Sequence, residues 1–223
     1  RSLHRRHRRG GIAKQLAAKG NGVMMVEYEG YGNSPGKASE QKLYQNAIDA
    51  AKHLNEKKNI PNGQIFVMGH SLGGPIAAHT AASAKEGNHF AGVILDSTVP
   101  SMPDLVKSYI DHNYLAKAEE PKKNYTLSRI RRDLDPKNGG GGLYETKNFI
   151  KQVPKSTEVF VINSVNDDIV DQTVGQKTMN AVRAVRPDAG VYWETKSSRS
   201  HLNYKARMPK IIEFIDSAYK PEK

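Results

Sequence analysis

Short apolar runs alternate with longer amphipathic stretches along this chain. Five runs have the length and composition of buried strands: residues 23–26, 65–68, 92–95, 159–162 and 191–193. Apolar residues recur at helical spacing in several of the stretches around them, namely 12–17, 43–54, 179–186 and 208–215. Strands that alternate with helices favour βαβ units. We therefore expect an α/β fold, a mostly parallel sheet with helices on both faces.

One connection in this pattern is too long for a simple crossover. About sixty residues separate the fourth run from Ser97, at the end of the third. Ser101 and Asp104 have the spacing of a helix start, and Leu127, Ile130 and Leu134 share a second helical face. We expect a small helical lid over about residues 100–150, with the glycine run at 139–142 as a flexible return.

The turn after the second run carries a serine between glycines, in the sequence GHSLGG at 69–74. Gly69 and Gly73 are expected to leave room for close backbone packing, so that Ser71 stands clear of the sheet edge. Such a strand-to-helix turn is typical of a nucleophilic serine. A plain helix cap is the other interpretation of Ser71. His70 is expected to point away from Ser71 and to be structural.

A nucleophilic serine needs a base and an acid that orients the base. Asp167 and Asp168 follow the fourth run, and His201 lies in a small-residue loop after the fifth. The carboxyl ends of parallel strands meet at one edge of a sheet, so these side chains are expected to converge on Ser71. An exposed loop histidine is the alternative for His201.

The order serine, aspartate, histidine, with a long insertion, resembles the α/β-hydrolase superfamily of serine hydrolases. It is most similar to the single-domain esterase, lysophospholipase and acyl-peptidase-like branch. YEGYGNSPG at 28–36 resembles the loop D-Y-R-G-Y-G-x-S-x-G of that branch, with Glu29 where arginine is usual. VINSVNDDIV at 161–170 resembles its acid loop V-I-H-G-x-x-D-x-I-V, which selects Asp167 over Asp168. Asp96 is a backup acid, because some members use that position.

The resemblance implies acyl transfer to water, with Ser71 as nucleophile, His201 as base and Asp167 as orienting acid. The Leu72 N–H would be one oxyanion donor, and a second would come from the loop before the first helix. No metal or organic cofactor is called for. The expected substrate is a carboxylic ester or thioester of a small or acyl-chain molecule, and a peptidase or acyl-peptidase is an alternative. The candidate pocket residues are Tyr31, Tyr109 and Ile110.

The net positive charge of the chain suggests a second class of function, the binding of an anionic partner. The formal net charge is +11, and Arg1, Arg5, Arg6, Arg8 and Arg9 contribute to it. Residues 1–9 are expected to be a disordered basic arm before a hydrolase domain over 10–223, or an arm that binds nucleic acid or an anionic membrane. A non-catalytic binding module on a hydrolase scaffold is therefore an alternative function.

The sequence also gives expectations about the cellular location of the protein and about a segment upstream of residue 1. The sequence shows neither a signal peptide nor a membrane-spanning run, so a cytoplasmic location is favoured. Hydrolases of this type have a central strand before the first helix, and residues 1–11 contain no apolar run that could form it. We therefore expect an upstream segment that supplies this strand between residues 23–26 and 65–68.

Overall fold

The computed structural model describes residues 11–113, 120–135, 137, 142–195, 201–202 and 204–219, so the basic arm over 1–9 lies outside them. The helices are α2 (Ile12–Ala17), α3 (Glu40–Lys58), α4 (Gly73–Ala82), α5 (Met102–Asn113), α6 (Glu120–Leu134), α7 (Thr146–Ile150), α8 (Gln172–Arg183) and α9 (Tyr204–Ala218), with a short 3-10 helix η1 (Asn62–Gln64). No helix in these ranges is both long and apolar enough to cross a bilayer.

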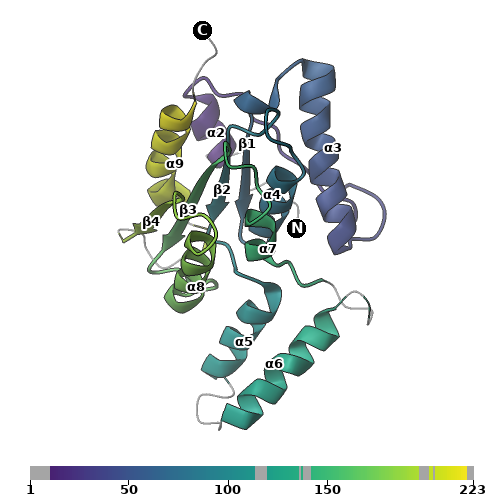
Figure 1. Cartoon of the computed structure of the whole chain (residues 1–223), viewed down its shortest axis with the longest axis vertical. Coiled ribbons are helices and arrows are strands. Elements are labelled where there is room, and N and C mark those ends of the chain that lie inside the picture. Colours follow the sequence, from purple (N-terminus) through teal and green to yellow (C-terminus); the bar gives the residue numbers. More distant parts are fainter. Residues whose placement is uncertain are drawn as a thin grey trace.

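Four parallel strands form the sheet at the centre of the molecule (Figure 1). They are β1 (Phe66–His70), β2 (Gly92–Asp96), β3 (Glu158–Ser164) and β4 (Gly190–Glu194), and they lie side by side in chain order. Each pair is joined by a connection that contains at least one helix, as parallel pairing requires. The predicted parallel sheet covered by helices is confirmed, as are four of the five predicted strands.

Alternate residues of the central strands face two different layers of helices. Val93 and Leu95 of β2 belong to a core cluster with residues of α4, α7 and α8. Ile94, between them, packs with Met208 and Ile211 of α9 and with α2. This period of two on a strand buried on both faces explains why the run at 92–95 is continuously apolar in sequence.

The run Val23–Val26 is not a strand, which corrects the sequence prediction. The segment has no strand pairing, and Val23, Met24 and Met25 are exposed by 40 %, 44 % and 39 %. β1 pairs with β2 along one edge, and no strand of the described residues pairs along its other edge. A strand is stabilised by backbone hydrogen bonds to a neighbouring strand. Without such a neighbour, an apolar run has no reason to adopt the strand conformation. Direct pairing between 23–26 and 65–68 is therefore absent from the described part of the chain.

The long connection between β2 and β3 is helical, and α5 and α6 project from one end of the molecule (Figure 1). Its two ends are held together by backbone and side-chain bonds, which we call the clasp. The Met102 N–H donates to Leu143 O at 2.8 Å, and the Thr146 N–H donates to Pro100 O at 3.0 Å. The Thr146 hydroxyl donates to Val99 O at 2.6 Å. The insertion therefore leaves the sheet and returns to it at one place.

A buried carboxylate from α3 completes the clasp. Glu40 accepts hydrogen bonds from the Leu143 N–H at 3.1 Å, the Tyr144 N–H at 2.8 Å and the Tyr44 hydroxyl at 2.5 Å. Gly142 has φ +120°, and a Cβ there would lie 2.5 Å from a Glu40 oxygen. The return of the insertion is therefore tightly packed at Gly142, while residues 139–141 of the predicted flexible return lie outside the described residues.

Candidate active site

Ser71 occupies a strained turn between β1 and α4. Its φ is +54°, in a region that residues other than glycine rarely adopt. A Cβ on Gly69 would lie 2.0 Å from Gly73 O, so this position needs glycine. The prediction for Gly73 itself is wrong, because a Cβ there would meet nothing within 4 Å. The second close approach is at Gly74, where a Cβ would lie 1.8 Å from the Thr98 hydroxyl.

The backbone of Ser71 is fixed from the end of β2. Its N–H donates to Asp96 O at 2.9 Å, and its carbonyl accepts from the Thr98 hydroxyl at 2.8 Å. Thr98 is fully buried, and its own carbonyl accepts from the Thr178 hydroxyl at 3.0 Å. The strained turn is therefore held by bonds that come from a neighbouring strand and not only by its own sequence.

We expect Thr98→Val to lower kcat on a p-nitrophenyl ester about tenfold, because one neutral hydrogen bond that fixes the turn is lost without a large change in volume. Thr98→Ser keeps the hydroxyl and is expected to stay close to the wild type. Steady-state kinetics on both variants, with circular dichroism as a check of the fold, measures this. Equal losses in the two variants would contradict the role of the hydroxyl, because Thr98→Ser keeps it.

His201 and Asp167 lie in direct contact at the carboxyl ends of the strands. The two carboxylate oxygens of Asp167 are 2.9 Å and 2.8 Å from His201 Nδ1. Both residues are buried, with His201 5 % and Asp167 7 % exposed. The Asp167 carboxylate also accepts from the N–H groups of Ile169 at 2.9 Å and Val170 at 2.8 Å. An acid held in this way can fix the tautomer and orientation of the imidazole.

The environment favours the ionised form of Asp167. Burial alone would raise the pKa of this carboxyl, but the hydrogen bond and charge of His201, together with the Ile169 and Val170 N–H groups, outweigh burial and lower the pKa. A carboxyl whose pKa is lower in the folded than in the unfolded chain stabilises the fold at neutral pH. This contribution is lost as the pH falls through the lowered pKa.

The two backup acids hold other partners. Asp168 accepts from the main-chain N–H of His201 at 2.7 Å, and no contact of Asp168 with the imidazole occurs among the described residues. Asp96 is fully buried and forms an ion pair with Arg207, Nε to Oδ1 at 2.6 Å. Only Asp167 of the three meets the imidazole of His201.

His70 is closer to the site than the sequence suggested. Its ring centroid lies 4.4 Å from that of His201, with the planes tilted by 39°. Its Nδ1 lies 3.2 Å from Asp96 Oδ2. The register of the sheet pairs His70 with Asp96. The sequence feature that could have predicted this contact is the position of both residues at the carboxyl ends of adjacent strands.

The structure gives little support for the three residues predicted to line a substrate pocket. Tyr31 is 47 % exposed. Tyr109 and Ile110 belong to α5, but their side chains lie outside the described residues. Leu72 directly precedes α4, so its N–H lies at the start of the helix. Its role as oxyanion donor stays a prediction.

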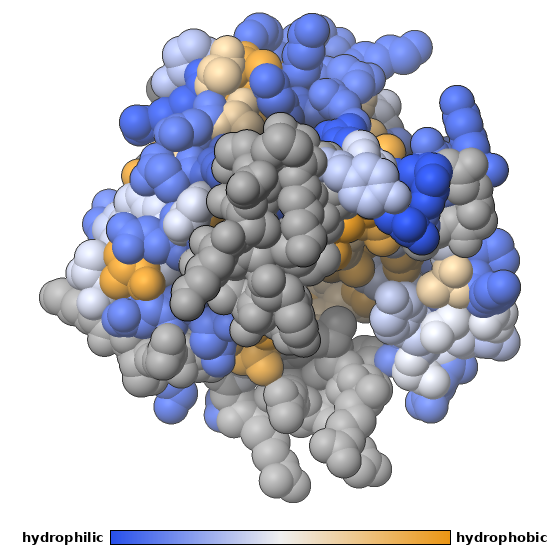
Figure 2. Space-filling model, turned by 90° about the horizontal axis from the view of Figure 1, so that it is seen from below, coloured by the Kyte–Doolittle hydropathy of each residue, from blue (hydrophilic) through white to orange (hydrophobic). Residues whose placement is uncertain are grey.

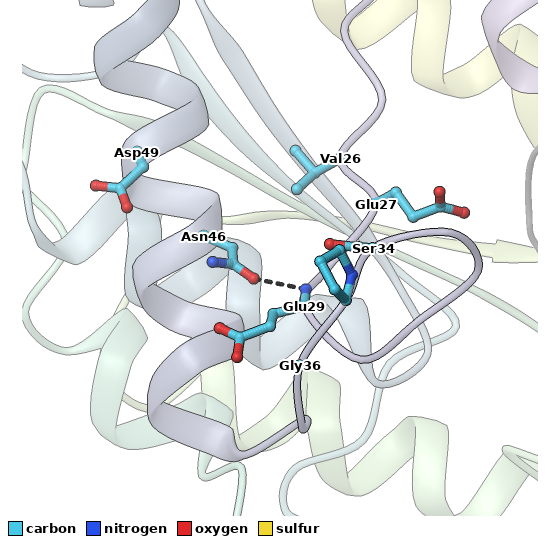
Figure 3. Close-up of a pocket in the computed structure, with 8 residues that line it drawn as sticks. Val26, Glu27, Glu29, Ser34, Gly36, Asn46 and Asp49 are labelled. Atoms are coloured by element: carbon cyan, nitrogen blue, oxygen red, sulfur yellow. Dashed lines mark hydrogen bonds between the residues drawn. The ribbon is translucent and has the colours of Figure 1, made fainter.

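A cavity of about 630 Å³ lies elsewhere, between residues 26–36 and α3. Figure 3 shows carboxylates of Glu27, Glu29 and Asp49 around it, and the Glu29 N–H donates to the Asn46 side chain at 2.8 Å. The lining includes none of Ser71, Asp167 and His201. Within the described ranges, no three His, Cys, Asp or Glu side chains are grouped as a metal site would require.

Comparison with known proteins agrees with this fold. Residues 6–115 match the model of a family described as serine aminopeptidase, S33, a segment that contains Ser71 and ends before Asp167 and His201. A multifunctional-autoprocessing repeats-in-toxin protein of Vibrio cholerae is 37 % identical over 99 residues, which are 44 % of this chain and 2 % of that protein.

Two solved structures are similar over most of the chain. An α/β hydrolase of Vibrio vulnificus has a TM-score of 0.62 and 25 % identity, covering 86 % of this chain and 61 % of that one. An esterase of Pyrococcus furiosus has a TM-score of 0.64 and 17 % identity, covering 94 % of this chain and 74 % of that one. The chain thus spans a small part of its curated relative and 61 % of the Vibrio vulnificus structure.

The fold is that of the α/β hydrolases, as the motifs predicted, and the family match over residues 6–115 supports membership of that superfamily. The family match and the esterase among its structural neighbours support a hydrolase.

Proposed function

We propose that the protein is a serine hydrolase that cleaves carboxylic esters with Ser71 as nucleophile, His201 as general base and Asp167 as orienting acid. The observation that carries the proposal is the contact of the Asp167 carboxylate with His201 Nδ1 at 2.8 Å. This contact leaves the other ring nitrogen, Nε2, for a proton transfer. The strained turn with Ser71 at φ +54° supports the same assignment, because such strain is concentrated at functional positions.

The mechanism follows from these positions. His201 Nε2 takes the proton of the Ser71 hydroxyl as its oxygen attacks the ester carbonyl, and then gives this proton to the leaving alcohol. The Leu72 N–H and the N-terminus of α4 face the developing oxyanion. Water, activated by His201, releases the acid. No hydrogen bond joins Ser71 to His201 among the described residues, and bonds of this kind often tighten only when substrate binds.

An ester is favoured over a peptide by the surface at the end of the molecule from which α5 and α6 project. Seen from that end, hydrophobic residues lie in a recess with hydrophilic residues along one side of it (Figure 2). Apolar surface of this kind suits an acyl chain. A peptidase is the second candidate, and the description of the matching family as serine aminopeptidase supports it.

Covalent labelling tests the nucleophile. A fluorophosphonate probe is expected to label the purified protein, and mass spectrometry of its peptides is expected to place the label on Ser71. A label on another serine would contradict the proposal, as would a folded protein that takes up no label.

The substrate class needs a separate comparison. We expect p-nitrophenyl esters to be hydrolysed with kcat/KM rising as the acyl chain lengthens by a few carbons, because each buried CH₂ contributes about 0.8 kcal/mol. Aminoacyl p-nitroanilides are expected to be poor substrates under the same conditions. A flat chain-length series would contradict the acyl pocket, and preferred cleavage of the anilides would favour the peptidase.

A further inference from the structure

Behind the candidate site lies a buried ion pair to which the mechanism gives no role. Asp96 at the end of β2 and Arg207 in α9 are both 0 % exposed, and Arg207 Nε lies 2.6 Å from Asp96 Oδ1. A second nitrogen of the same guanidinium, Nη2, donates to the carbonyl oxygen of His201 at 3.1 Å. Arg207 therefore joins the end of β2 to the residue proposed as the base.

The same carboxylate also holds the ring that packs on His201. Asp96 Oδ2 lies 3.2 Å from His70 Nδ1, and the His70 ring lies 4.4 Å from the ring of His201. Tyr204 packs edge-on against His70 at 4.9 Å, and the Arg207 guanidinium lies over the Tyr204 ring at 5.5 Å. One buried carboxylate thus lies within ion-pair distance of two groups that contact His201, one at its backbone and one at its ring.

Stability alone is a weak reason for such a pair. Burying two charges costs desolvation free energy, which their mutual attraction often only just offsets. Apolar residues of the same volume often stabilise a protein as much or more. The protein contains a second buried arginine that serves as a comparison. Arg186 is 1 % exposed and pairs with Asp188 at 2.7 Å, and it donates to Pro154 O and Thr157 O before the start of β3. That arginine lies near the amino end of β3, away from Ser71 and His201, and its hydrogen bonds within the described ranges go to Asp188 and to main-chain carbonyls of residues 154–157.

The backbone of His201 is held from both sides. Its N–H donates to Asp168 at 2.7 Å, while its carbonyl accepts from Arg207. Its ring is held at Nδ1 by Asp167 and on one face by His70. Removal of Asp167 would affect the tautomer of the imidazole, whereas removal of Arg207 or His70 would affect only its place.

We propose that Arg207 and His70, both fixed by Asp96, are positioning residues that set the place of the His201 imidazole relative to Ser71. The proposal rests on the function proposed above. It gives Asp96 a role different from that of a backup acid, because Asp96 acts through Arg207 and His70 and does not touch the imidazole.

The experiment compares a double variant that removes the ion pair with one that removes the second buried arginine and its partly exposed partner, Asp188. Arg207→Met alone leaves Asp96 buried and unpaired and is expected not to fold, so the test variant is Asp96→Asn/Arg207→Met. We expect it to fold and to lose about 10- to 100-fold in kcat, the effect of a small displacement of a reacting group, with KM changed less than about twofold. Arg186→Met/Asp188→Asn is the control and is expected to keep the wild-type kcat.

A spectroscopic readout separates this inference from the proposed function. With ¹³C-labelled histidine, the Cε1–H resonance of His201, assigned by its loss in His201→Gln, is expected to shift in the test variant and not in the control. If the wild type is not labelled at Ser71, the proposed function fails, while this resonance still reports the position of His201. A folded test variant with unchanged kcat and an unchanged resonance would overturn the inference.

A second pair of variants keeps the test open if the double variant does not fold. His70→Ala removes the ring that packs on His201 and is expected to lower kcat about tenfold and to shift the His201 resonance. His70→Phe keeps an aromatic ring there and is expected to recover most of kcat. Equal activity of His70→Ala and the wild type, with no shift of the resonance, would overturn the role of His70.

Discussion

Ser71→Ala is expected to lower kcat on a p-nitrophenyl ester by a factor on the order of 10⁶ and to abolish labelling by a fluorophosphonate. The hydroxyl is the only group at this turn that can form the acyl-enzyme. The fold is expected to persist, because the bonds from Asp96 O and the Thr98 hydroxyl involve the backbone of Ser71 and not its side chain. Activity and labelling are measured on the same folded sample.

Ser83→Ala is the matched control for this change. Ser83 directly follows the opposite end of α4, where its hydroxyl donates to Thr80 O at 2.7 Å. This variant is expected to keep activity and labelling. A control preparation without the protein measures any contaminating esterase. Ester hydrolysis by Ser71→Ala that exceeds this control would show that another residue carries the activity.

Asp167→Asn is expected to lower kcat by about 10⁴ while the protein stays folded. The amide can donate to His201 Nδ1 and so favours the wrong tautomer, with the proton on Nε2, which then cannot accept the proton of Ser71. The stability of the variant is expected to change less between neutral and acid pH than that of the wild type, because the lowered pKa of Asp167 is removed. Steady-state kinetics and denaturant unfolding at several pH values measure the two effects.

Asp168→Asn distinguishes this role from the effect of a nearby charge. Asp168 follows Asp167 in the same loop, and its side chain meets the His201 main chain. The amide oxygen of asparagine can still accept that N–H, so kcat is expected to fall less than about tenfold. A larger loss in Asp168→Asn than in Asp167→Asn would show that the wrong acid has been chosen.

The sheet was predictable because its signal is local. The runs at 65–68, 92–95, 159–162 and 191–193 are short and apolar, with helical patterns between them, and a buried parallel strand imposes this composition on its own residues. Val23–Val26 has the same composition and is not a strand. A run becomes a strand only when a neighbour pairs with it, and the sequence of the run does not contain that neighbour.

The candidate site was predictable to the extent that it consists of motifs. Ser71, Asp167 and His201 each follow an apolar run, so topology alone brings them to one edge of the sheet. The roles of His70, Arg207 and Thr98 depend on register and on how α9 packs, which no single segment encodes. Gly73 was chosen by spacing, whereas the close approach lies at Gly74, where the neighbour is Thr98, two residues after the end of β2.

The clasp has a consequence for how proteins of this shape can diversify. Val99, Pro100 and Met102 at one end and Leu143 and Thr146 at the other are bonded across a short distance, so the segment between them is an exchangeable module. The entropic cost of closing such a loop grows only with the logarithm of its length. Grafting a longer or shorter module between these residues is therefore expected to leave the sheet in place, provided that the module keeps the contact of α5 with α8, where the Ser108 hydroxyl donates to Asp171 at 2.9 Å. With the function proposed above, substrate range is expected to change by recombination at this one junction.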